Sequence, residues 1–305
     1  MTLNNHNCLL QALCKQWPHT AVNDWEIRPL SGLTNESYYA TNGEYHIVGR
    51  RQGQQAKQLG VNRQRESAIL RHLSQVKIAP QVIAMVPHWL LLEWLPGHII
   101  GQNEFSQPEF LQKLAALLAI LHHQPLFGYR LQLRHQLESH WLQIDKARLT
   151  PCWLRLHKRF MSSPMPSILK LSPVHMDVHC GNLLNTSQGL KLIDWEYATD
   201  TDIGFALAAL FRTDHWDEPQ QQDFLNYYCS QPSGYLNRTL LERQIKRWQP
   251  WVDYMILMWF EVRWKQSGDP HFLELAQPLR LSFGLYPMDF KVDRDGKGAN
   301  PREHR

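Results

Sequence analysis

The pattern of apolar and polar positions divides the chain into an early strand-rich part and a longer helical part. Two runs with strand character, 36–41 and 44–50, flank the dipeptide Asn42-Gly43. The tightest hairpin turns need positive φ at both central positions, which Asn and Gly tolerate, so the pattern predicts a β-hairpin. The other elements expected in this part are a helix within 57–75 and strands at 82–86 and 89–94.

From residue 109 onward the apolar side chains recur at helix spacing, as Leu114, Leu117 and Leu121 illustrate. A short β-rich island is expected at about 171–197. The helices expected around it are 136–146, 152–160, 205–212, 218–229 and 239–266.

The chain is therefore predicted to have an α+β fold with two lobes. We expect a small antiparallel-sheet N-lobe in 1–95, a larger, mostly helical C-lobe in 96–287 and a flexible polar tail in 288–305. Two lobes joined by a connector enclose a cleft, and such clefts are preferred ligand sites.

Composition narrows the class of protein without naming a function. The 305 residues are 43% hydrophobic and 20% charged, which suits a folded domain, and the formal charge of +4 suits an anionic ligand. No dense Lys/Arg run predicts nucleic-acid binding. Five cysteines without a Cys-x-x-Cys pair favour neither disulfides nor zinc. Without a signal peptide or membrane span, we expect a cytoplasmic protein and a monomer.

Three oxygen-bearing side chains form the strongest chemical signal. Asp177 and Asn182 lie five positions apart in a Gly-containing loop, and Asp194 ends the strand candidate that follows. A hairpin can bring all three side chains to one space. Phosphoryl transfer needs such a set: one carboxylate orients the acceptor hydroxyl, while an amide and a second carboxylate hold magnesium.

The same segment resembles the aminoglycoside phosphotransferase and choline kinase superfamily. Its loop reads His-x-Asp-x-x-x-x-Asn, here His175 to Asn182, and is followed by Ile193-Asp194-Trp195-Glu196. The resemblance implies a protein-kinase-like fold and the use of ATP and magnesium. It makes Asp177 the catalytic base and Asn182 and Asp194 the magnesium ligands. His175 is expected to support the loop, and Cys180 beside His179 is not expected to act as a nucleophile.

The resemblance also assigns residues to the nucleotide. The segment 30–35 resembles a phosphate-binding loop and provides Ser31, Gly32 and Asn35, with Ser31 in place of a glycine. The cation of the third strand is Arg50, with Arg51 as the alternative in register, although the family usually has lysine there.

The expected ion-pair partner of that cation is Glu66, which is equally compatible with a solvated helix face. The connector Glu93-Trp94-Leu95 is expected to bond adenine through its backbone, so Glu93 and Leu95 complete the nucleotide site.

Aromatic and acidic residues late in the chain suggest an acceptor site. A box for an organic cation can form from aromatic faces and a carboxylate, although aromatic residues at helix spacing more often pack a core. The candidate residues are Trp195, Glu196, Tyr197, Trp259, Glu261 and Trp264. Segments 171–179, 189–198, 247–251 and 259–269 resemble bacterial thiamine kinases, which implies thiamine as the small-molecule partner.

Other interpretations remain open at this stage. A choline, amino-alcohol or aminoglycoside kinase would use the same loop, although a polycationic aminoglycoside needs more acids than the late helices offer. A nucleotide-binding scaffold without turnover is a second class, which the complete Asp177–Asn182–Asp194 set disfavours. A metal hydrolase is a third, and no His-rich ligand spacing supports it.

Overall fold

The computed structural model describes residues 2–30, 37–213 and 216–285. Its first part is a five-stranded antiparallel sheet in the order β1-β2-β3-β5-β4. The strands are β1 Glu26–Pro29, β2 Ser37–Thr41, β3 His46–Arg51, β4 Val82–Val86 and β5 Trp89–Glu93. The predicted hairpin is β2-β3, in which Gly43 has φ 87° and Asn42 Oδ1 accepts the backbone N–H of Tyr45 at 2.8 Å.

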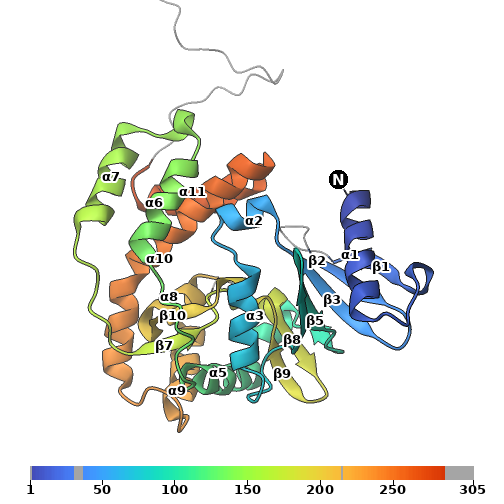
Figure 1. Cartoon of the computed structure of the whole chain (residues 1–305). Helices are drawn as coiled ribbons and strands as arrows, with labels where there is room; N and C mark the ends of the chain where they lie inside the picture. The colour runs from blue at the N-terminus through green and yellow to red at the C-terminus, as the bar shows by residue number, and fades with distance from the viewer. Residues whose placement is uncertain (1, 31–36, 214–215, 286–305) are drawn as a thin grey trace, which may run out of the picture.

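A helix covers each face of this sheet (Figure 1). Helix α1 (Thr2–Gln16) packs Leu9 and Leu13 against Trp89 and Leu91 on the outer face. Gly49 of β3 allows this close approach, because a Cβ there would lie 2.9 Å from Leu9 Cδ1. The polar N-terminus had suggested no element, so α1 is an addition to the predicted fold.

The inner face meets α3 (Arg63–His72), whose Ile69 and Leu70 are almost fully buried. The helix expected within 57–75 is in fact two helices, α2 (Gln54–Gln58) and α3. The break follows from Asn62, whose Oδ1 accepts the backbone N–H groups of Gln64 at 2.9 Å and Arg65 at 3.1 Å. This N-cap satisfies donors that a continuous helix would have bonded internally.

The rest of the described chain is mostly helical and forms what we call the helical half, in contrast to the sheet half built around β1–β5. Helix α5 lies beside α9 below the sheet, and the long α10 runs along α6, α8 and α11 (Figure 1). The helices are α4 Gln102–Phe105, α5 Pro108–His122, α6 Leu133–Gln143, α7 Pro151–Ser162, α8 Ile203–Arg212, α9 Glu218–Ser230, α10 Arg238–Ser267 and α11 His271–Ser282. Helices α4 and α11 were not predicted.

Short strands carry the loops of the site. Strands β6 (His98–Ile99), β8 (Leu183–Thr186) and β9 (Gly189–Leu192) form one antiparallel sheet, and β7 (Leu171–Val174) pairs with β10 (Thr199–Asp202). Gly97 fixes the connector onto β8, because a Cβ there would lie 2.4 Å from Asn185 O. The β-rich island at 171–197 is thus confirmed and extends to Asp202.

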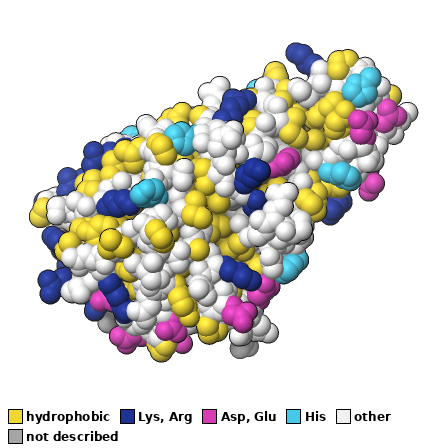
Figure 2. Space-filling view, turned by 90° about the horizontal axis from the view of Figure 1, so that it is seen from below, with side chains coloured by type: hydrophobic (Ala, Val, Ile, Leu, Met, Phe, Trp, Pro, Cys, Tyr) yellow, Lys and Arg dark blue, Asp and Glu magenta, His cyan; other side chains and the backbone are white. Residues whose placement is uncertain are grey.

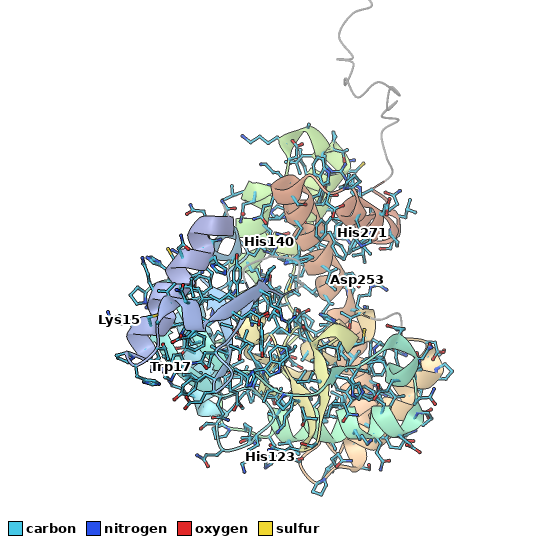
Figure 3. The ribbon with its side chains drawn as sticks, turned by 90° about the vertical axis from the view of Figure 1, so that its right-hand side faces the viewer. Lys15, Trp17, His123, His140, Asp253 and His271 are labelled. Atoms are coloured by element: carbon cyan, nitrogen blue, oxygen red, sulfur yellow. The ribbon has the colours of Figure 1, made fainter. Side chains whose placement is uncertain are left out.

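The two halves are distinct from more than one side. Figure 3 shows Lys15 and Trp17 on one side of the molecule and His271 on the other. Figure 2 shows basic, acidic and apolar side chains scattered among one another on the face seen from below.

Within the described ranges, no helix is both long and apolar enough to cross a membrane. Ser31, Gly32, Asn35 and the tail 288–305 lie outside the described residues.

Candidate active site

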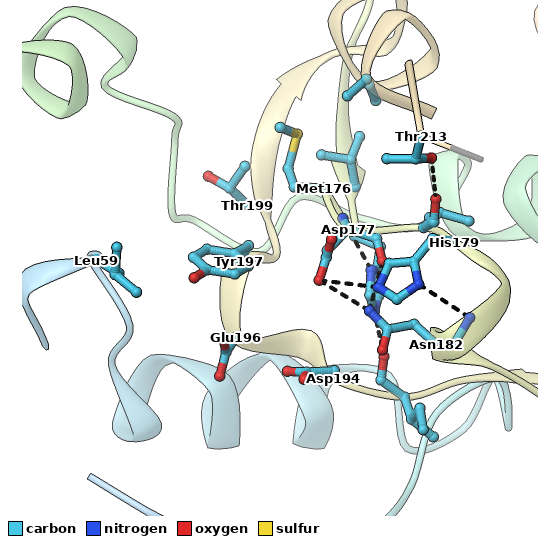
Figure 4. Close-up of a pocket in the computed structure, with 18 of the residues that line it drawn as sticks. Leu59, Met176, Asp177, His179, Asn182, Asp194, Glu196, Tyr197, Thr199 and Thr213 are labelled. Atoms are coloured by element: carbon cyan, nitrogen blue, oxygen red, sulfur yellow. Dashed lines mark hydrogen bonds and ion pairs between the residues drawn. The ribbon is translucent and has the colours of Figure 1, made fainter. Parts of the chain in front are cut away.

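A cleft of about 1380 Å³ lies between the sheet half and the helical half. Sites for one small ligand are usually about 300–1,000 Å³, so this cleft has room for a nucleotide and an acceptor together. Asp177, Asn182 and Asp194 all line it, and so does Arg50 from β3. The three residues that the sequence grouped are therefore brought to one space (Figure 4).

The loop that carries Asp177 is held by His175. This imidazole is 1% exposed, and burial lowers its pKa to about 4, so the ring is neutral. Its Nε2 donates to Ile193 O at 2.9 Å, and its Nδ1 accepts the backbone N–H of Asp177 at 3.3 Å. His175 thus ties the loop to the segment that bears Asp194, which is the supporting role expected of it.

The Asp177 carboxylate faces the cleft, and two side chains contact it. Asn182 Nδ2 donates to Asp177 Oδ2 at 3.0 Å and to Asp177 O at 2.9 Å, while His179 Nε2 lies 3.8 Å from the same Oδ2. Burial raises the pKa of Asp177; His179 opposes this effect and the charge of Asp194 adds to it. The sequence left His179 as a loop residue, and the structure places its ring beside the proposed base.

Asp194 follows β9 in an unusual backbone conformation. Its φ of 64° lies in the left-handed region, which costs energy for a residue with a Cβ and is often found at functional sites. Burial alone would raise the pKa of Asp194, but the charge of Arg50 and its hydrogen bond outweigh this effect and lower it. Its side chain is 37% exposed, so the charged carboxylate stays open to the cleft.

Arg50 reaches three carboxylates from the third strand. Its Nη1 donates to Glu66 Oε1 at 2.7 Å, and its Nη2 donates to Asp194 Oδ1 at 2.5 Å and Glu196 Oε2 at 2.7 Å. The structure thereby separates the two register alternatives: Arg50 points into the cleft, and Arg51 does not line it. Glu66 is fully buried against Arg50, so the solvated-face alternative for it is wrong.

The same cluster contains an arginine that the sequence reasoning missed. Arg63 Nη1 donates to Glu66 Oε2 at 2.7 Å and to Glu196 Oε2 at 2.9 Å. Two arginines therefore face three carboxylates. Burial and the charge of Asp194 raise the pKa of Glu196 to about 7 despite both arginines, which reflects the surplus of one carboxylate. The only feature of the sequence that could have indicated Arg63 was its place at the start of a helix, three positions before Glu66.

The oxygen atoms fit a magnesium ion that is shared with phosphates. Among the described residues, no group of three His, Cys, Asp or Glu side chains could hold a metal by itself. Magnesium binds proteins through one or two carboxylates and otherwise keeps waters and substrate phosphates. Asp194 supplies such a carboxylate. The Asn182 amide makes both its contacts through nitrogen, so its oxygen is the atom suited to a cation.

The connector between the halves lines the other end of the cleft. Glu93 and Leu95 both belong to its wall. The backbone N–H of Glu93 donates to Gln81 O, and that of Trp94 donates to His46 O, each at 3.0 Å. These two donors are therefore already in use. The connector's contact with adenine would have to come from its carbonyl groups or from the N–H of Leu95.

The candidate acceptor residues separate into two groups. Tyr197 and Trp259 line the cleft together, with Trp259 Nε1 at 3.3 Å from Tyr197 Oη, and Glu196 lines it as part of the charge cluster. The structure does not bring the other three candidates to the cleft.

Each of these three has a partner elsewhere. Trp195 is 1% exposed, donates to Leu192 O at 2.8 Å and packs on His175. Glu261 is fully buried against Arg148 and Arg280. Trp264 lies under the Arg148 guanidinium, 4.9 Å from ring centroid to Cζ. These positions correct the predicted acceptor site. For Glu261 and Trp264, helix spacing alone does not tell which face of α10 meets the cleft. Trp195 lies in the short helix after Asp194 and turns its ring into the core.

Comparisons with known proteins identify the family and the fold of the chain. A family model described as "Phosphotransferase enzyme family" matches residues 26–241. A thiamine kinase of Escherichia coli O1:K1 is 42% identical over 218 residues, covering 69% of this chain and 75% of that protein. The structure of choline kinase LicA from Streptococcus pneumoniae superposes with a TM-score of 0.69 at 19% identity, covering 86% of this chain and 94% of that one.

A second structure of LicA, in complex with AMP, superposes with a TM-score of 0.68 at 18% identity and covers 91% of this chain and 98% of that one. These structures confirm the protein-kinase-like, two-lobed α+β fold. The family model spans more than half of the chain, and the relative exceeds 40% identity. The chain therefore belongs to the phosphotransferase enzyme family and is a small-molecule kinase.

Proposed function

We propose that this kinase transfers the terminal phosphate of ATP, in the presence of magnesium, to the primary hydroxyl of thiamine, giving ADP and thiamine monophosphate. The observation that carries the proposal is the meeting of Asp177, Asn182 and Asp194 with the Arg50–Glu66 pair in one cleft. Phosphoryl transfer requires a base, metal-binding oxygens and a cation for the phosphates, and these residues supply all three.

In the proposed reaction, Asp177 accepts the hydrogen bond of the acceptor hydroxyl and takes its proton as the oxygen bonds to phosphorus. Asn182 holds the Asp177 carboxylate at 3.0 Å and so fixes its direction. Arg50 binds the nucleotide phosphates through Nη2, the group that meets Asp194 in this structure. Magnesium, held by Asn182 and Asp194, would neutralise charge on the phosphate oxygens.

The nucleotide is assigned from the cleft wall and from a neighbour. The connector wall with Glu93 and Leu95 lies on the sheet-half side of the cleft, where a planar base can pack against Leu92. A choline kinase with the same fold was solved in complex with AMP, which supports the use of a nucleotide. The predicted phosphate loop with Ser31, Gly32 and Asn35 belongs to the same proposal.

The acceptor end of the cleft favours a substrate with one cationic centre and a flat, apolar body. Tyr197, Trp259 and Phe260 provide aromatic surface there. The carboxylates that line the cleft, within the described part of the chain, are Glu93, Asp177, Asp194 and Glu196. None of them lies on α6 or α10, so a polycation would find few partners, whereas a thiazolium ring can pack on aromatic faces.

The relative that is 42% identical is a thiamine kinase, which supports thiamine over choline as the acceptor. The test is an acceptor screen with the purified chain, magnesium and ATP, using thiamine, choline, ethanolamine and an aminoglycoside. We expect ADP release and a new phosphate monoester, detected by phosphorus NMR, with thiamine. Absence of thiamine-dependent ADP would remove thiamine as the substrate.

Asp177→Asn provides the matched control for that screen. The variant should keep its fold and its melting temperature, because Asp177 is partly exposed and Asn is of the same size. Its turnover should fall by about 10²–10⁴, the usual contribution of a positioned general base. Near-normal turnover in this variant would refute the role of Asp177 even if thiamine proved to be the acceptor.

A further inference from the structure

The side chain of Arg63 lies beneath the cleft and has no assigned role in the reaction. It is 0% exposed and does not line the cleft, so it does not meet a ligand directly. Its Nε donates to Arg51 O at 3.1 Å, and its backbone N–H donates to Gln52 Oε1 at 2.7 Å. The start of α3 is thereby fixed to the end of β3, the strand that carries Arg50.

Arg63 and Arg50 form ion pairs with the same two carboxylates, Glu66 and Glu196. Glu66 gives Oε1 to Arg50 and Oε2 to Arg63, each at 2.7 Å. Glu196 Oε2 accepts from Arg50 at 2.7 Å and from Arg63 at 2.9 Å. The four side chains close a ring whose charges balance. We call this set, Arg50, Arg63, Glu66 and Glu196, the four-charge ring.

The ring joins the two halves of the molecule at the edge of the site. Glu66 and both arginines come from the sheet half, whereas Glu196 lies in the short helix η4 (Trp195–Tyr197) just after Asp194. Asp194 is the fifth charge, and only Arg50 contacts it among the ring's members. The direction of Arg50 Nη2 toward Asp194 therefore depends on where the two glutamates are held.

We propose that Arg63 is a positioning residue, which holds Glu66 and Glu196 so that Arg50 keeps one arm directed at Asp194 and the incoming phosphates. This inference rests on the proposed use of a nucleotide. A buried carboxylate without a compensating cation is costly, so it draws the nearest one toward it. Without Arg63, the two glutamates would have only Arg50 between them and would turn its Nη2 away from the cleft.

The arrangement also accounts for arginine at position 50. A lysine at this position would carry one ammonium point charge, whereas a guanidinium has two separate arms that can bind a fixed carboxylate and a ligand together. In this chain Nη1 stays on Glu66 and Nη2 is shared between Glu196 and Asp194. Arg63 binds the second oxygen of Glu66, so that Arg50 needs only Nη1 for this carboxylate and its Nη2 stays directed at Glu196 and Asp194.

The test measures Mg-ADP affinity by calorimetry, together with the KM values for ATP and for the acceptor, in Arg63→Met. We expect Mg-ADP to bind about tenfold more weakly, because one member of a buried charge network that orients the phosphate-binding arm is lost. The KM for ATP should rise to match, while the KM for the acceptor stays within about twofold. Arg71→Met is the matched control, since Arg71 is exposed on the same helix and does not line the cleft.

A second variant separates positioning from general loss of stability. In Arg63→Met the four remaining charges sum to −2, and adding Glu196→Gln restores the −1 of the unmodified cluster. The double variant should recover Mg-ADP affinity relative to Arg63→Met, and Arg63→Lys should lie between the two. Unchanged Mg-ADP affinity in folded Arg63→Met would overturn the inference, as would equal losses for nucleotide and acceptor without rescue.

The Mg-ADP readout does not depend on the acceptor. If thiamine were not phosphorylated, the proposed function would fail while the effect of Arg63 on nucleotide affinity could still be measured. If Arg63→Met did not fold, Arg63→Lys and the double variant would give the answer, because both keep more of the charge balance. Failure of these two to differ in Mg-ADP affinity would count against the inference.

Discussion

The described part of the chain contains two buried clusters of arginine and carboxylate, which differ in charge and in access. The four-charge ring with Asp194 contains two arginines and three carboxylates, and Asp194 is 37% exposed to the cleft. The second cluster, which we call the helix clamp, contains Arg148, Arg280 and Glu261. Glu261 is 0% exposed and accepts from Arg148 at 2.6 Å and from Arg280 at 2.8 Å.

The two clusters contain the same residue types, and the exposure of their carboxylates distinguishes a site from a structural support. In the helix clamp the single carboxylate is enclosed by cations, and the arginines pack on Trp264 and Trp153. This cluster connects α10, α11 and the short helix at 146–148, and none of its three residues lines the cleft. In the cleft the surplus charge is a carboxylate that is open to solvent, which is what a magnesium–nucleotide complex requires.

The largest expected effect comes from removing the surplus carboxylate with Asp194→Asn. Turnover should fall at least about a thousandfold, because several kcal/mol of charge stabilisation at the phosphates would be lost. Stability should change little, since Arg50 keeps Glu66 and Glu196 as partners. Steady-state turnover across magnesium concentrations, with urea unfolding in parallel, measures both. Turnover within tenfold of that of the unmodified protein would show that the exposed carboxylate of Asp194 is not needed for the reaction.

Glu261→Gln tests the opposite behaviour. Two buried or half-buried arginines would lose their shared carboxylate, so the free energy of unfolding should fall by about 3–5 kcal/mol. Turnover and acceptor KM of the folded protein should stay near normal, because Glu261 does not line the cleft. Glu242→Gln, which breaks a partly exposed i,i+4 pair with Arg238, is the control and should cost only about 0.3–0.5 kcal/mol. A large rise in the KM for the acceptor would contradict this structural role and indicate that Glu261 contributes to acceptor binding.

A third test concerns buried ionisable groups that have no charge partner. Burial lowers the pKa of His122 to about 3 and that of His140 to about 4. The unfolded chain binds these protons near the usual pKa of about 6.5. The contribution of these two histidines to the free energy of unfolding should therefore be constant above that pH and fall as the pH drops below it, by about 2 kcal/mol per histidine at pH 5.

Urea unfolding at pH 7 and pH 5 is compared between the unmodified protein and a variant, so that the contributions of other titrating groups, such as Glu196, cancel. His140→Leu should reduce the acid-induced loss by the share of one histidine, because the residue that must take a proton on unfolding is gone. His123, exposed at the end of α5, is the control, and its replacement should leave the pH dependence unchanged (Figure 3). Equal pH slopes for the His140→Leu variant and the unmodified protein would contradict the assignment.

Local patterns in the sequence predicted most of the elements. The β2-β3 hairpin follows from Asn42-Gly43, strand β4 was placed at its observed bounds, and α9 and α10 begin within a residue of the expected positions. The division of α2 from α3 was missed, because the cap of Asn62 and the turn at Gly60 outweigh a continuous helical pattern. The boundary between lobes at residue 95 stays a prediction.

The residues of the candidate site also fall into those that local sequence patterns predicted and those that they missed. Asp177, Asn182 and Asp194 were predictable because a loop and the next strand fix their relation over a short stretch of chain. Glu261 and Trp264 were not, since their partner Arg148 comes from a distant segment, and helix spacing shows a face without showing what covers it. Arg63 was missed because a single arginine in a polar helix carries no pattern until its buried partners are known.

Helix α1 has a practical consequence that lies far from the chemistry. It seals the outer face of the sheet, where Ile47, Trp89 and Leu91 are almost fully buried beneath Leu9 and Leu13. A shortened protein that began after Gln16 would present this apolar surface to water, and such surfaces promote self-association. We therefore expect the protein to stay dispersed in concentrated solution only while α1 covers the sheet. A fusion at the N-terminus should leave Leu9 packed against Gly49.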